Sequence, residues 1–164
     1  MHWESALTAT AEVGIGIAGF SGIFAAIARR NPEDWGARQQ VSLGVLLLAS
    51  GSAIFASLLP FLLLEAGVSS AACWTIGSAI YGSWLGGVLV MRARQGLRLG
   101  TWPPQDWEST ARYVGGIAVV ILHAINSAVI QAPWPYMVGI YYQLLVSFLA
   151  FRHLLGSASE TRSA

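Results

Sequence analysis

Residues 41–64 read VSLGVLLLASGSAIFASLLPFLLL, an apolar stretch without a single charged side chain. A helix needs about 20 apolar residues to cross about 30 Å of hydrocarbon, so this stretch is long enough to span a bilayer. A strand of a membrane barrel would alternate apolar and polar residues, and this stretch does not. The segment therefore predicts a transmembrane helix.

Four further stretches share this character, and together they predict an all-α polytopic bundle of about five spans. The predicted spans cover residues 5–28, 41–64, 71–91, 113–132 and 136–155. Pro133 and Pro135 force the turn between the last two spans. We expect residues 1–155 to form a single transmembrane domain and residues 156–164, which are small and polar, to form a short disordered tail.

The composition agrees with a chain surrounded by lipid. Only 10% of the 164 residues are charged, whereas soluble domains carry roughly 25%. We therefore expect the outer surface of the protein to contact a lipid bilayer. The membrane that we expect is a cell membrane, namely a bacterial inner membrane. The nine basic residues are all arginines and are scattered along the chain, so we expect no nucleic-acid partner.

The arginines also predict the orientation of the spans. If five spans alternate in direction, every arginine falls on the same side of the membrane. The nine are Arg29, Arg30, Arg38, Arg92, Arg94, Arg98, Arg112, Arg152 and Arg162. Because basic residues are retained in the cytoplasm, we expect the N-terminus outside and the C-terminus in the cytoplasm.

Small residues recur at helical spacing in the first and third predicted spans. Helix backbones approach closely in lipid where side chains are small, so these positions are expected to pack against other helices. The positions are Gly14, Ala18 and Gly22 in the first span and Ser78, Gly82 and Gly86 in the third. The sequence leaves open whether they pack within one chain or between copies.

Four polar side chains within the spans are costly to place in hydrocarbon, namely Glu12, His123, Asn126 and Gln143. Counting ~1.5 Å per residue from the nearest predicted span end puts all four at a similar depth, roughly 10–15 Å below the outer boundary. Ionisable residues inside spans often mark an ion or proton path. The sequence therefore predicts a shared ion or proton site in the outer half of the bilayer, with Glu12 as its titrating group.

A simpler interpretation applies to three of these residues. Asn126 and Gln143 also fit ordinary interhelical hydrogen bonds, and His123 also fits an interhelical donor that has found its acceptor. The sequence favours Glu12 as a functional residue, because packing explains a carboxylate least well.

Two functions compete at this point. One is a homo-oligomeric channel or an ion- or proton-coupled transporter. The alternative is a non-catalytic accessory subunit that associates with other subunits of a larger membrane complex. We expect no enzyme, metal site or cofactor, because the sequence lacks a His-Glu-x-x-His motif and a Gly-x-Ser-x-Gly turn.

Overall fold

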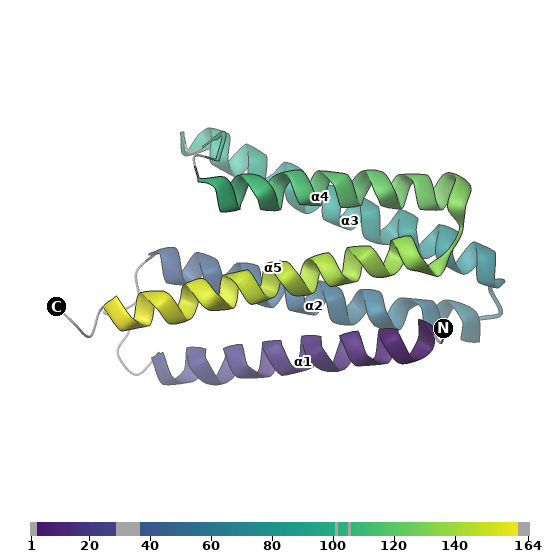
Figure 1. Ribbon diagram of the computed structural model, residues 1–164, viewed down its shortest axis with the longest axis horizontal. Helices are drawn as coiled ribbons and strands as arrows, with labels where there is room; N and C mark the ends of the chain where they lie inside the picture. Colours follow the sequence, from purple (N-terminus) through teal and green to yellow (C-terminus); the bar gives the residue numbers. More distant parts are fainter. Residues whose placement is uncertain (1–2, 29–36, 101, 105, 161–164) are drawn as a thin grey trace. The chain divides into compact units, whose positions relative to one another are not determined.

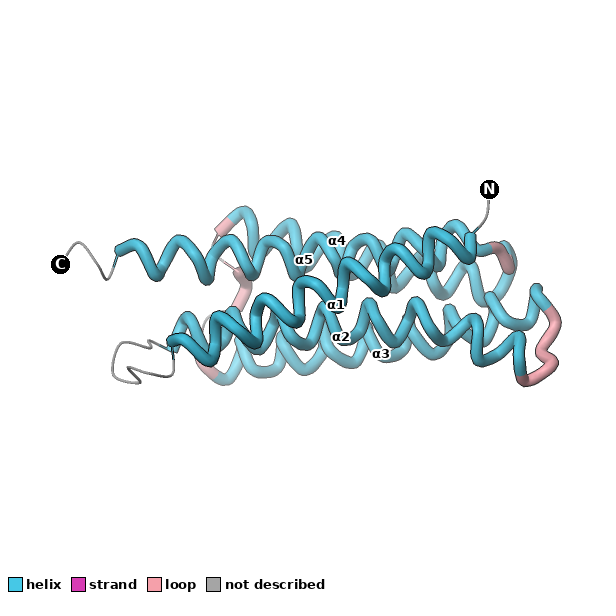
Figure 2. Tube along the Cα trace, turned by 90° about the horizontal axis from the view of Figure 1, so that it is seen from below, coloured by secondary structure: helices cyan, strands magenta, loops and turns pink. Residues whose placement is uncertain are grey.

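The computed structural model describes residues 3–28, 37–100, 102–104 and 106–160, and no residue in these ranges forms a strand (Figure 2). Along the chain follow α1 (Trp3–Ala28), α2 (Ala37–Glu65), α3 (Ser70–Arg98), α4 (Trp107–Ile125), the π-helix η2 (Asn126–Ile130) and α5 (Pro133–Glu160), as drawn in Figure 1. The all-α class expected from the sequence is confirmed.

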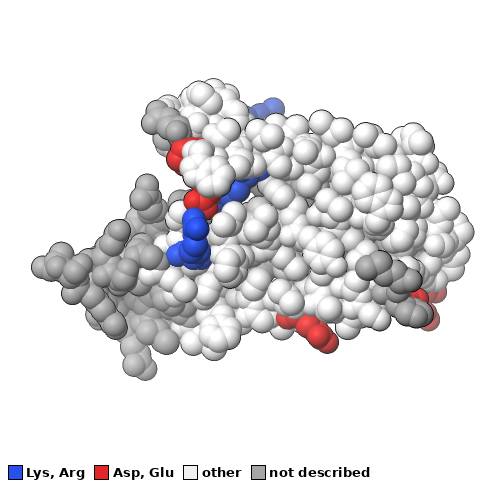
Figure 3. All heavy atoms as spheres, in the orientation of Figure 1, with Lys and Arg blue, Asp and Glu red and all other residues white. Residues whose placement is uncertain are grey.

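Within the described ranges, five helices are long and apolar enough to cross a membrane. The candidate spans are Trp3–Ile23, Gln40–Glu65, Ser70–Arg98, Trp107–Ile130 and Pro133–Leu155. On the face shown in Figure 3, most of the described surface is neither acidic nor basic. The expected five-span fold is therefore confirmed.

The helices at the α3–α4 turn are longer than the predicted spans. α3 continues to Arg98, and α4 begins at Trp107. The length of an apolar stretch indicates only the part of a helix that lies in the hydrocarbon of the bilayer. The helix can continue beyond that part, because its backbone hydrogen bonds form within the helix itself. The start of α4 is fixed by a cap, because the Asp106 carboxylate accepts a hydrogen bond of 2.7 Å from the Ser109 backbone N–H.

α5 also extends beyond the predicted span at both ends. It begins at Pro133, because a proline fits the first helical turn, where its missing N–H would have no acceptor anyway. At the other end α5 runs to Glu160. Residues 156–160 of the predicted tail are therefore helical, while residues 161–164 lie outside the described residues.

The chain divides into two compact units, and α2 and α5 contribute to both. Unit 1 contains Met1–Leu58 and Gln143–Ala164, and unit 2 contains Leu59–Tyr142. In unit 1, the hydroxyls of Thr10 and Ser57 form a hydrogen bond of 2.9 Å between α1 and α2. The buried apolar side chains of this unit include Leu7, Leu46, Ala53, Ala150 and Leu154.

Unit 2 is built on an antiparallel hairpin of α3 and α4. Near the α3–α4 turn, the Tyr113 hydroxyl donates to the Leu89 carbonyl at 2.6 Å. At the opposite end of the hairpin, Asn126 donates to Ser78 at 2.7 Å. There the chain passes through η2 into the first turns of α5, which belong to the same unit (Figure 1). This end of unit 2 holds two of the predicted site residues.

Candidate functional site

Asn126 closes the connection between α4 and α5. Its side-chain Nδ2 donates to the Ala132 carbonyl at 3.1 Å, and its Oδ1 accepts from the Ala132 N–H at 3.0 Å. The same Nδ2 donates to Ser78 Oγ on α3. The backbone forms the π-helix η2 here and then reverses at Gln131, whose φ of 52° lies in the left-handed region. Asn126 is fully buried, and these three bonds give it a structural role.

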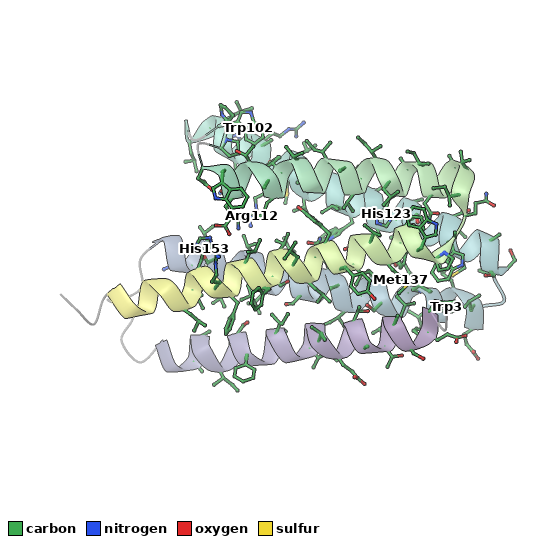
Figure 4. All side chains as sticks on the ribbon, viewed as in Figure 1. Trp3, Trp102, Arg112, His123, Met137 and His153 are labelled. Atoms are coloured by element: carbon green, nitrogen blue, oxygen red, sulfur yellow. The ribbon has the colours of Figure 1, made fainter. Side chains whose placement is uncertain are left out.

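His123, which precedes Asn126 on α4, is fully buried between two glycines. A Cβ at Gly82 on α3 would lie 2.9 Å from the Cβ of His123, and a Cβ at Gly139 on α5 would overlap with His123 Nε2. Figure 4 shows the ring between α4 and the first turns of α5. Neither glycine can carry a side chain without displacing the imidazole.

Two tyrosines complete the surroundings of the ring. The ring centroid of Tyr81 lies 5.1 Å and that of Tyr136 lies 5.7 Å from that of His123, both edge-on at 87°. This geometry is favourable between aromatic rings. The Tyr81 hydroxyl donates to the Gly139 carbonyl at 3.2 Å. We call His123, Tyr81, Tyr136, Gly82 and Gly139 the histidine cage.

Both nitrogens of the imidazole in the cage lack a hydrogen-bond partner among the described residues. Nδ1 and Nε2 of His123 are both buried and form no hydrogen bond within the part of the chain that the structure describes. A buried polar group without a partner costs about 1–3 kcal/mol. The hydrogen bond from His123 to another helix, which the simpler interpretation of the sequence expected, is not present among the described residues. The ring is held there by packing.

The four residues of the predicted site do not lie in one unit. His123 and Asn126 belong to unit 2, whereas Glu12 and Gln143 belong to unit 1. Gln143 is buried on α5, and its backbone carbonyl accepts a hydrogen bond of 2.9 Å from the hydroxyl of Ser147. Glu12 is exposed on α1. Within unit 2, the structure brings His123 of α4 together with Asn126 at the start of η2.

Glu12 shares its exposed face of α1 with small residues. Four exposed residues precede or follow Glu12 on α1, namely Ser5, Thr8, Gly16 and Gly19. Together with Glu12 they recur at spacings of three or four residues, which places them on one side of a helix. A Cβ added at Gly16 or Gly19 would meet no atom within 4 Å. We call these five residues the Glu12 face.

The predicted packing positions fall into two groups. Ser78 bonds to Asn126, and three glycines lie against side chains of neighbouring helices, namely Gly14, Gly82 and Gly86. Ala18 is half-buried, and Gly22 is exposed with nothing within 4 Å of an added Cβ. The small residues of α1 are thus only partly covered by the described chain.

Tyr81 and Tyr136 were not predicted to take part in a site. A signal for Tyr81 is present in the sequence, because it follows Ser78 by three residues and adjoins Gly82, on the side of the helix where small residues were recognised. Tyr136 carries no such signal, since it is the first residue of the fifth predicted span and directly follows the Pro133–Pro135 turn.

The spans and the buried polar residues define this chain as a helical, multi-pass membrane protein. Within the described residues, no group of three or more His, Cys, Asp and Glu side chains could hold a metal ion. No family model, curated protein or solved structure matches the chain. Its function is therefore inferred from its own residues.

Proposed function

We propose that this chain assembles with further copies of itself and moves protons or small cations across a membrane, with Glu12 as the titrating group. The observation that carries the proposal is the position of Glu12, which is exposed on a membrane-spanning helix. Within the described residues, the Glu12 carboxylate forms no hydrogen bond or ion pair.

The depth of Glu12 makes this exposure costly. The span of α1 begins at Trp3, and nine residues at ~1.5 Å each place Glu12 about 14 Å into the span. A charged side chain near the centre of a bilayer costs about 3 kcal/mol or more on insertion scales, and such residues face a helix interface or water rather than lipid. Glu12 therefore needs a neighbour that the described residues of unit 1 do not provide.

The Glu12 face supplies a surface for that neighbour. Gly16 and Gly19 let another backbone approach closely, and the Ser5 hydroxyl can form a hydrogen bond in the same interface. The Thr8 hydroxyl, which donates to the Glu4 carbonyl, can accept one there. Copies that pack through this face bring several Glu12 carboxylates together, away from lipid. Several carboxylates gathered at this depth form a site that can bind protons or small cations.

The same face also favours a second candidate function, that of an accessory subunit. The bare surface over Gly16 and Gly19 accepts a helix of a different membrane protein as well as a helix of another copy. The two functions differ in what is purified with the chain in mild detergent. A stoichiometric heterologous protein supports the accessory subunit, and copies of the chain alone support the homo-oligomer.

For the orientation, we propose that the arginine-rich end of the α3–α4 hairpin lies in the cytoplasm. Arg98 ends α3, and Arg112 stands near the start of α4, so the two residues share that end. Under alternation of the spans, the N-terminus is then outside. Arg29, Arg30 and Arg162 lie outside the described residues. A tag at the N-terminus that reports the outside and a tag at the C-terminus that reports the cytoplasm support this orientation.

Proton flux into liposomes tests the transport function. The purified chain is reconstituted with an internal pH dye, and flux is driven by a potassium diffusion potential with valinomycin. We expect Glu12→Gln to reduce flux to the level of protein-free liposomes. Glu65→Gln is the matched control, because Glu65 is exposed at the end of α2. Equal flux, for protons and for small cations, in the wild type and in Glu12→Gln would refute the proposal.

A further inference from the structure

The contact between His123 and Gly139 depends on which atoms carry hydrogen. A side chain at Gly139 would overlap with His123 Nε2, so the glycine hydrogen that stands in its place points at that nitrogen. A neutral imidazole has one N–H and one bare nitrogen, whereas an imidazolium has an N–H at both positions. The contact thus distinguishes the two forms of the ring.

A bare Nε2 fits this contact. Its lone pair faces a Cα–H group, which is a weak hydrogen-bond donor. A protonated Nε2 would instead direct its N–H at the same Cα–H, and two hydrogens that both carry partial positive charge would meet at close range. The packed cage therefore accommodates His123 only while Nε2 is unprotonated.

No other group in the cage compensates for a charge on the ring. The titratable side chains that face His123 are the phenols of Tyr81 from α3 and Tyr136 from α5. The carbonyl of Gly139 already accepts a hydrogen bond from the Tyr81 hydroxyl. Directly after α4, the neighbouring polar residue is Asn126 of η2, a neutral amide whose Nδ2 donates to Ser78 and Ala132 and whose Oδ1 accepts from the Ala132 N–H. Within the described residues, no carboxylate pairs with the imidazole.

We infer that Nε2 of His123 is a proton-binding site that the packing of α5 keeps closed. When a proton from hydronium forms the N–H bond at Nε2, the ring gains one positive charge and hydronium becomes water. The protonated ring no longer fits against Gly139, and the first turns of α5 separate from α3 and α4 within unit 2. This site goes beyond the proposed function and is independent of Glu12.

Hydrogen exchange in nanodiscs tests the consequence for α5. Backbone amides of residues 137–142 are followed at about pH 7.5 and about pH 5, the interval in which histidine charge changes. After correction for intrinsic rates, we expect exchange at the lower pH to be at least about tenfold faster in the wild type. In His123→Leu, which cannot take up a proton, this increase should disappear.

A control histidine separates the cage from a general effect of acid. His153 is exposed on α5, and His153→Gln should keep the full increase in exchange. An increase that persists in His123→Leu, or its absence from the wild type, overturns the inference.

A measurement on the wild type keeps the test decisive if His123→Leu does not fold. Nitrogen-15 NMR of labelled histidine reports directly whether Nδ1 or Nε2 carries the proton. At about pH 7.5, His123 should show a bare Nε2, and its protonation should share its midpoint with the change in exchange. A protonated Nε2 at the higher pH contradicts the inference.

Discussion

Substitution of Gly139 by alanine is the sharpest test of the histidine cage. The added Cβ would overlap with His123 Nε2 and would also lie 2.9 Å from Cε1 of Tyr81. Both neighbours are ring atoms of buried side chains, so neither gives way without moving a helix. The substitution also disturbs the hydrogen bond from the Tyr81 hydroxyl to the Gly139 carbonyl.

The expected loss of stability follows from these two effects. Forcing an extra carbon into a well-packed core costs about 1–3 kcal/mol, and a lost hydrogen bond costs about 1 kcal/mol. Gly139→Ala should therefore destabilise the protein by about 2–4 kcal/mol. Gly87→Ala is the matched control, because Gly87 is an exposed helical glycine with nothing within 4 Å of an added Cβ.

Unfolding by SDS in mixed detergent micelles, followed by circular dichroism, measures the difference. Gly87→Ala should leave the midpoint unchanged or raise it slightly, because alanine is favoured over glycine in a helix by roughly 0.5–1 kcal/mol. In the background of His123→Ala, the cost of Gly139→Ala should fall, since the overlapping ring is gone, with a coupling of about 0.5–3 kcal/mol. If Gly139→Ala is as stable as Gly87→Ala, the cage is not packed as described.

Three further substitutions test the two ends of unit 2. Asn126→Leu should lower the free energy of unfolding by about 1–3 kcal/mol, because it removes the hydrogen bonds of Asn126 to the backbone N–H and carbonyl of Ala132. Ser78→Ala removes one hydrogen bond and should lower this free energy by only about 0.6 kcal/mol. Equal losses for the two variants in the same SDS titration would contradict this expectation. At the start of α4, the backbone N–H of Ser109 holds the pKa of Asp106 below its usual value of 3.8. Because the folded-state pKa is lowered, the Asp106 carboxylate stabilises the cap at pH values above 3.8, and this stabilisation is lost as the pH falls through the folded-state pKa. Amide exchange in the first turn of α4 should therefore accelerate over that pH interval in the wild type and not in Asp106→Asn. An unchanged pH response in the variant would argue against the cap.

The fold was predictable because hydrocarbon imposes a simple rule on sequence. A stretch such as residues 41–64 can only be a spanning helix, since every backbone group must find its partner within the segment. The helix ends were less predictable. Asp106 and Pro133 start helices through local chemistry that a count of apolar residues does not record.

The candidate site was only partly predictable, for a different reason. Helical periodicity shows that His123 and Asn126 share one side of the fourth predicted span, and the structure buries both. Periodicity does not show which helices pair or how each is rotated. The approach of Gly139 to the imidazole, and the separation of Glu12 from His123 into different units, depend on that pairing.

Native mass spectrometry from lipid nanodiscs measures directly how many copies of the chain assemble, which the proposed covering of the Glu12 carboxylate requires to be more than one. One chain has a mass of 17.5 kDa, and we predict a particle whose protein mass is a multiple of that value. Gly16→Leu, which places a bulky side chain on the Glu12 face, should reduce the mass to that of one chain, and Gly87→Leu should not. A wild-type particle of 17.5 kDa would contradict the proposed assembly and the transport function that depends on it.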